Sequence, residues 1–176
     1  MKNKILVVAL ALAAAGCAAT DQRSPSGATS TMPVAIAVPS GNVAAMTWVG
    51  VGDLTYECRA KADGSGHEWV FAGPNAVLYD RDRKVVGKYY GGPTWEASDG
   101  SKITGKQLAV SPGPSGAIPL QLVQTTPGSG AMTGVTYIQR VKTQGGIAPK
   151  DACAAGNMGA KQTVKYQADY VFYKAR

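Results

Sequence analysis

The chain has 176 residues, of which 45% are hydrophobic and 16% charged, and its formal net charge is +7. Its 22 glycines and 10 prolines leave no window long enough for an amphipathic helix of three turns. The basic residues are scattered, and those between Arg81 and Lys84 alternate with Asp80 and Asp82. This pattern predicts a solvated turn and argues against a nucleic-acid partner.

The first sixteen residues have the organisation of a secretory signal peptide. Lys2 and Lys4 precede an apolar run from Ile5 to Ala15, which ends just before Cys17. The run is shorter than the roughly 20 residues that a membrane-spanning helix needs, and no later segment is apolar enough to span. We therefore expect residues 1–16 to be removed and the protein to be exported.

The signal ends in A-A-G-C, the arrangement in which lipoprotein signal peptidase makes the cysteine the lipidated first residue. Ala14 departs from this pattern, because leucine is favoured there. Ala18 is not the aspartate that retains lipoproteins in the inner membrane, so lipidation at Cys17 predicts an outer-membrane lipoprotein facing the periplasm. The alternative is ordinary cleavage near Ala19, which would release a soluble periplasmic or secreted protein.

The rest of the chain divides into a linker and one folded part. Residues 17–31 are rich in small and polar side chains, which predicts a flexible tether. Residues 32–176 have the length of a single domain.

The domain has the alternating pattern of an all-β protein. Apolar and polar residues alternate over 54–59, over 135–142 (with Val135, Tyr137 and Val141 on one face) and over 164–173, and this period of two indicates strands. About ten short strands predict an antiparallel sandwich or a closed barrel. The further predicted strands are 34–38, 44–51, 68–72, 77–80, 85–90, 103–110 and 118–124.

Two cysteines remain once Cys17 is lipidated or removed. Because an exported protein folds in an oxidising compartment, we predict a disulfide between Cys58 and Cys153. The alternative is two unrelated buried thiols.

The stretch from Tyr89 to Ser101, Y-Y-G-G-P-T-W-E-A-S-D-G-S, contains two turn signals, G-G-P and D-G-S. Turn formation explains the glycines and the proline, but it does not require Trp95 or Glu96. In one interpretation Trp95 packs into the core and Glu96 pairs with Arg140. In the other, an aromatic and acidic surface binds a glycan or a peptide; it would comprise Tyr89, Tyr90, Trp95, Glu96 and Asp99.

Three blocks carry a resemblance to a known family: G-P-T-W-E at 92–96, Q-R-V-K-T-Q-G-G-I-A-P at 139–149 and Y-Q-A-D-Y-V-F-Y at 166–173. From about residue 42 to 174, the chain resembles the family called domain of unknown function 3455. Its members are secreted bacterial and fungal proteins without an established activity, so the resemblance implies export but no chemistry. The chain departs from the family at Tyr89, where members often have histidine, and at 120–122, where L-Q-L replaces W-L-L.

The sequence offers little for catalysis. The nearest approach to a dinucleotide motif, G-V-G-D-L-T at 50–55, lacks the third glycine, and a single histidine, His67, provides no convincing metal set. We expect no cofactor, no metal and no membrane contact beyond the N-terminal lipid. The expected function is a binding or structural module of the cell envelope. The alternative is a hydrolase that acts on envelope polysaccharide or peptide through Glu96 and Asp99.

Overall fold

The computed structural model describes residues 32–176, which form one compact unit. The predicted signal peptide, the lipidation of Cys17 and the tether lie outside the described residues and stay predictions. No helix in the described part is long and apolar enough to cross a membrane.

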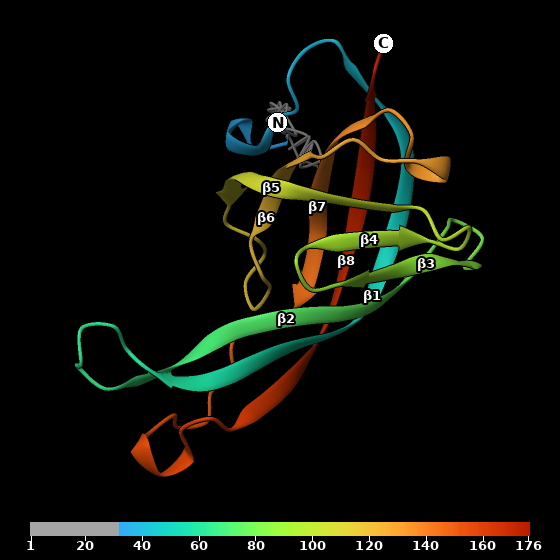
Figure 1. The fold of residues 1–176 in the computed structure, drawn as a ribbon. Coiled ribbons are helices and arrows are strands. Elements are labelled where there is room, and N and C mark those ends of the chain that lie inside the picture. Colours follow the sequence, from blue (N-terminus) through green and yellow to red (C-terminus); the bar gives the residue numbers. More distant parts are fainter. Residues whose placement is uncertain (1–31) are drawn as a thin grey trace, which may run out of the picture. The chain divides into compact units, whose positions relative to one another are not determined.

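Eight antiparallel strands follow one another around a closed barrel, in which β8 pairs with β1 (Figure 1). The all-β fold is confirmed, and of its two predicted forms the structure adopts the barrel. Three short 3-10 turns complete it: η1 (Val34–Ile36), η2 (Gly130–Met132) and η3 (Ala155–Asn157). The strands are β1 (Asn42–Ala60), β2 (His67–Tyr79), β3 (Val85–Tyr90), β4 (Thr94–Ala97), β5 (Lys102–Ser111), β6 (Leu120–Thr125), β7 (Val135–Gly145) and β8 (Lys161–Ala175).

The count is eight strands and not ten because two pairs of predicted segments merge and 34–38 is not a strand, whereas β4 was not among the ten predicted segments. The segments 44–51 and 54–59 belong to the single strand β1, and 68–72 and 77–80 both belong to β2. Gly52 lies within β1, although the predicted segments were separated at this position. A Cβ atom at Gly52 would collide with the Asn75 carbonyl oxygen on β2. The absent side chain thus lets two strands approach closely.

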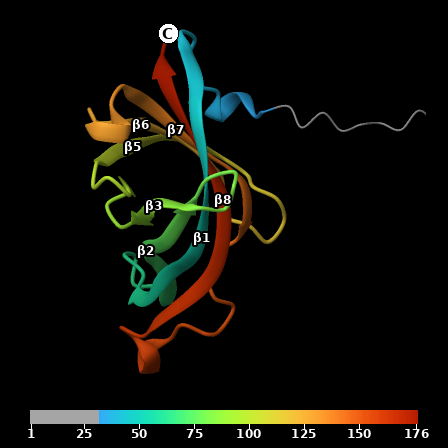
Figure 2. The same ribbon diagram turned by 90° about the vertical axis from the view of Figure 1, so that its right-hand side faces the viewer.

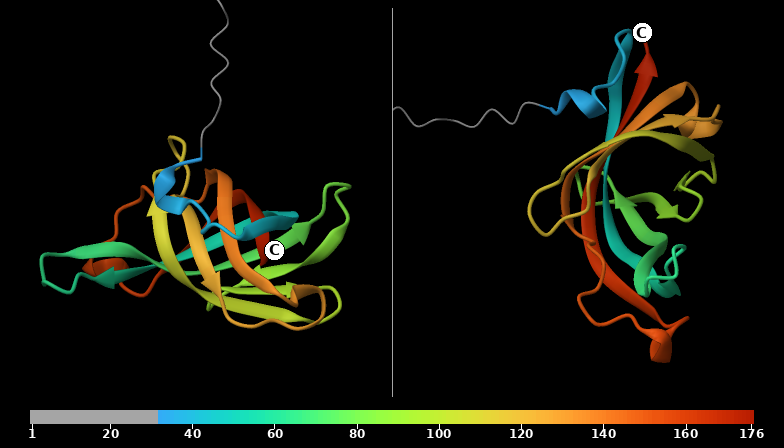
Figure 3. Two further views of the ribbon diagram at one scale, coloured as in Figure 1. Left: turned by 90° about the horizontal axis from the view of Figure 1, so that it is seen from above. Right: turned by 90° about the vertical axis from the view of Figure 1, so that its left-hand side faces the viewer.

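The interior is apolar at its centre. The predicted alternation of β8 is confirmed, since Tyr166, Ala168, Tyr170 and Phe172 are buried and belong to one core cluster. The Phe172 ring lies 4.7 Å from that of Trp48 on β1. Strands β1 and β8 run side by side (Figure 2), and the sheet curves around this core (Figure 3).

Strand β7 departs from the predicted alternation. Its pairing with β8 shifts between Val135 and Tyr137, so Val135 faces the interior cluster, whereas Tyr137 and Val141 contact a second cluster around Ile36 of η1. A β-bulge of this kind reverses the facing of the residues that follow it, here as far as a second register shift between Val141 and Gln144. The segment 34–38, predicted as a strand, instead contains η1, whose Ile36 is fully buried.

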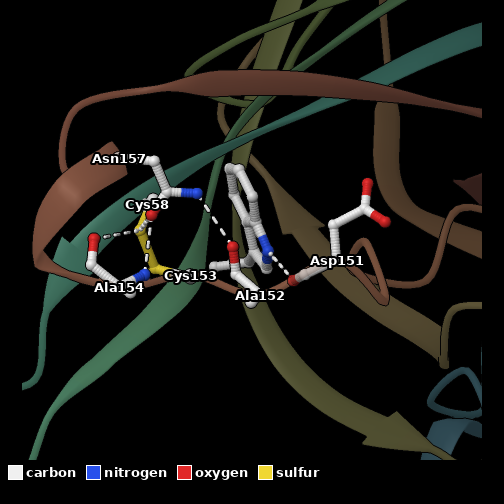
Figure 4. The surroundings of a disulfide bond; sticks show 7 residues. Cys58, Asp151, Ala152, Cys153, Ala154 and Asn157 are labelled. Atoms are coloured by element: carbon white, nitrogen blue, oxygen red, sulfur yellow. Dashed lines mark hydrogen bonds between the residues drawn. A yellow bond between two sulfur atoms is a disulfide. The ribbon is translucent and has the colours of Figure 1, made fainter.

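The predicted disulfide is confirmed between Cys58 of β1 and Cys153, with their Cα atoms 5.5 Å apart. Hydrogen bonds fix the segment around Cys153 (Figure 4): the Asn157 side chain accepts from the Ala154 amide at 2.7 Å and donates to the Ala152 carbonyl at 2.8 Å. Trp69 Nε1 of β2 donates to a backbone carbonyl in the same segment at 2.8 Å. The bridge therefore ties the chain before β8 to the β1–β2 hairpin.

Replacing both Cys58 and Cys153 by serine should lower the free energy of unfolding by about 4 to 5 kcal/mol, because the bridge closes a long loop that restricts the unfolded chain. Urea denaturation measures the loss. Reduced wild-type protein is the control and should unfold at the same urea concentration as the double variant. Equal stability of the oxidised wild type and the variant would contradict this expectation.

Candidate functional site

Four of the five residues of the predicted binding surface lie on β3 and β4, on opposite faces, and the fifth, Asp99, lies in the turn that follows β4. Tyr89 and Trp95 are cross-strand partners that point into the barrel, with exposed fractions of 5% and 0%, and their rings stack at 4.8 Å. Tyr90 and Glu96 point outward, where the Tyr90 hydroxyl donates to Glu96 Oε2 at 2.7 Å. The structure therefore does not bring these residues together into one surface.

Glu96 forms ion pairs with two lysines on the outside of the barrel. Its carboxylate pairs with Lys88 at 3.3 Å and Lys102 at 3.4 Å. The Tyr90 hydrogen bond, helped by these lysines, holds the pKa of Glu96 below its usual value. The predicted pair with Arg140 is wrong, because Arg140 faces the interior and donates from Nε and Nη2 to the Pro119 carbonyl, at 3.2 and 2.9 Å.

Asp99 has a structural role in the turn between β4 and β5. It accepts hydrogen bonds from the Ser101 amide at 2.9 Å, from the Ser101 hydroxyl and from the Ala131 amide at 3.0 Å. These bonds, led by the Ser101 hydroxyl, lower the pKa of Asp99. Asp99 thereby connects the turn to η2.

Two adjoining hollows open at one end of the barrel, beside the turn between β3 and β4 and the loop between β5 and β6. Their volumes are about 210 and 240 Å³. We call them together the mouth. Both hollows share Phe71, Gln107, Gln121 and Arg140. The first adds Leu54, Tyr56, Ile118 and Pro119, and the second adds 72–74, Tyr89 and 91–93.

Strand geometry brings the shared residues together from four different strands. Gln121 of β6 is directly opposite Arg140 of β7, and its amide donates to Gln107 Oε1 of β5 at 2.5 Å. Phe71 of β2 contacts Tyr56 of β1 edge to face, with ring centroids 5.8 Å apart. The mouth thus combines an aromatic wall with a polar wall.

Arg140 provides the positive charge of this site. It takes part in none of the ion pairs formed by residues 32–176, and no acidic residue lines the mouth. Burial raises the pKa values of Tyr56, Tyr89, Tyr166 and Tyr170, and the nearby guanidinium partly offsets each rise. Arg140 therefore lies close to four neutral phenols but to no carboxylate partner.

Sequence reasoning found only part of this site. It named Tyr89, and it assigned Arg140 to a structural pair, but it missed Phe71, Gln107 and Gln121. The available signal was the placement of Gln121 and Arg140 among the apolar residues of β6 and β7, whereas Gln107, between the exposed Lys106 and Leu108, gave none. Within residues 32–176 no cluster of three histidine, cysteine or acidic residues could hold a metal ion.

Replacing Trp95 by alanine should destabilise the protein by about 3 to 5 kcal/mol, because it leaves a cavity beneath the Tyr89 ring. Glu96→Gln, one residue away on the outer face, is the matched control and should change the unfolding midpoint little, since its lysine partners are more than half exposed. Chemical denaturation compares the two variants. A larger effect for Glu96→Gln would overturn this assignment of faces.

The Asp99 contacts should make stability depend on pH. Because folding lowers the pKa of Asp99, its contribution is complete above the ordinary value of 3.8 and is lost as the pH falls through the lower folded value. Asp99→Asn should therefore be destabilising at about pH 7, with a deficit that shrinks towards about pH 3. Urea titrations across this range measure the deficit, and one independent of pH would disprove the role of the charge.

Comparison with known proteins supports the resemblance noted from the sequence blocks. A family model described as "Protein of unknown function (DUF3455)" matches residues 39–174, which include all eight strands of the barrel except the last residue of β8. No curated protein and no solved structure matches the chain. The chain therefore belongs to the family of proteins of unknown function called DUF3455.

Proposed function

We propose that this protein is a binding module of the cell envelope that takes a small organic ligand into the mouth of its barrel. The observation that carries this proposal is the pair of hollows whose shared wall is formed by Phe71, Gln107, Gln121 and Arg140. Ligand sites of this kind are concave and mostly apolar, have a few convergent polar groups, and often lie in the mouths of β-barrels.

The size of the mouth favours a small molecule over the glycan or peptide expected from the sequence. The two hollows measure about 210 and 240 Å³, so even together they reach only the lower part of the usual range for small-molecule sites. The exposed aromatic row needed for a sugar platform is also absent from β3 and β4, since Tyr89 and Trp95 are buried.

The proposed location is the periplasmic face of the outer membrane, with lipidated Cys17 as the anchor. The signal-like N-terminus supports export, and the disulfide agrees with an oxidising compartment. Cleavage near Ala19 is the alternative, and it would leave the same barrel soluble in the periplasm or secreted.

A hydrolase that uses Glu96 and Asp99 is less well supported. Both carboxylates have lowered pKa values, whereas a catalytic acid near neutral pH needs a raised one. Neither residue lines the mouth.

The proposal predicts that Phe71→Ala weakens the binding of an uncharged aromatic probe, N-phenyl-1-naphthylamine, by about tenfold, because the ligand loses an aromatic wall. Fluorescence titration of the purified full chain measures the dissociation constant. Leu108→Ala is the control: Leu108 is 46% exposed, close to the 50% of Phe71, and it lines neither hollow.

Binding that is insensitive to Phe71→Ala, or equally sensitive to Leu108→Ala, would place the probe elsewhere and contradict the proposal. Circular dichroism should give the same spectrum for both variants, because both replaced side chains are about half exposed.

A further inference from the structure

The mouth contains a positive charge for which the described protein provides no negative partner. The Arg140 guanidinium uses Nε and Nη2 for the Pro119 carbonyl, which leaves Nη1 without an acceptor among residues 32–176. Arg140 is only partly buried, so this edge of the guanidinium can be reached from the mouth, and a guanidinium beside apolar and phenolic walls forms strong charge-assisted hydrogen bonds with an anion. The free edge of Arg140 is therefore a site where an anion would be stabilised.

We infer that the ligand of the mouth is a small organic acid, whose carboxylate binds Arg140 and whose flat apolar body lies against Phe71. This inference rests on the proposed function and specifies the chemistry of its ligand. The planar guanidinium matches a carboxylate in geometry and pairs with it through charge-assisted hydrogen bonds.

The charge count favours a carboxylate over a phosphate. Arg140 is the sole cationic side chain lining the mouth, and no lysine joins it there. One arginine balances the single charge of a carboxylate, but it would leave much of the charge of a phosphate monoester uncompensated. The absence of acidic residues from both linings disfavours a cationic ligand.

The walls define the rest of the ligand. Phe71 and Tyr56 meet edge to face, so Phe71, which is 50% exposed, can offer ring surface to a guest. Pro74, Pro93 and Pro119 add rigid apolar surface. The paired amides of Gln107 and Gln121 can bond a polar substituent. These walls suit a compact aromatic or cyclic acid.

The test compares two probes of nearly equal shape, 2-naphthoate and its uncharged amide, 2-naphthamide, by isothermal titration calorimetry on the purified full chain. Naphthoate should bind about tenfold more tightly, because only the acid forms a charge-assisted pair. This comparison on the unaltered chain needs no variant, so it holds even where an Arg140 substitution fails to fold.

Two variants assign the preference to Arg140. Arg140→Gln should abolish the preference for the acid, whereas Lys106→Gln should keep it, because Lys106 carries the same charge next to Gln107 but lines neither hollow. Arg140→Lys retains the charge without the planar fork and should retain only part of the preference.

The outcomes separate the two proposals. Equal affinity for both probes, with both weakened by Phe71→Ala, would overturn the inference and leave the binding site standing. A preference for the acid that survives Arg140→Gln would also overturn it. If neither probe shows binding that depends on Phe71, both the inference and the proposed function fail.

Discussion

The closure of the sheet by β1 and β8 is the constraint on which the other features depend. The two strands pair from Asn42 with Ala175 to Glu57 with Lys161, and this leaves each strand with one inner and one outer face. Consecutive residues on a strand therefore face opposite sides of the sheet. Trp95 is buried in the core, whereas Glu96 pairs with lysines on the outer surface. The same rule directs Arg140 inward, away from every carboxylate that pairs on the outside.

The disulfide extends this closure beyond the barrel. Cys58 lies on the part of β1 that continues past the mouth, and its bridge to Cys153, together with the Trp69 hydrogen bond, fastens the chain before β8 to the β1–β2 hairpin. Phe71, which forms one wall of the mouth, belongs to that hairpin. A wall held in place on the free protein loses less entropy when a ligand binds, so the bridge supports the mouth as well as the fold.

Much of the fold was predictable from local sequence patterns and from the number of cysteines. The alternation of apolar and polar residues predicted which face of β8 is buried. The two cysteines that remain after Cys17 predicted the disulfide. The rest depended on contacts between distant strands. The predicted strands 44–51 and 54–59 were separated at Gly52, although this glycine lies within β1 and permits the close approach of β2. The bulge of β7 changes which of its residues face the interior, although the sequence alternates regularly there. The mouth was not predicted, because Gln107, Gln121 and Arg140 lie on three different strands and only the fold brings them together.

The packed core and the proposed binding site occupy different parts of the barrel interior. Its far end is packed with residues such as Phe172 and Ile138, and next to Arg140 lies Tyr170, whose hydroxyl bonds that of Tyr166 at 3.1 Å. Burial raises the pKa values of both phenols, so they stay neutral and provide hydrogen-bonding groups without a counter-charge. Arg140 differs from these phenols because it is charged and only partly buried, and its two hydrogen bonds to the Pro119 carbonyl hold it at the edge of this interior. An anion bound at the mouth would supply the charge partner that Arg140 lacks among residues 32–176, so the proposed binding would use the partly buried rim and leave the packed interior unchanged.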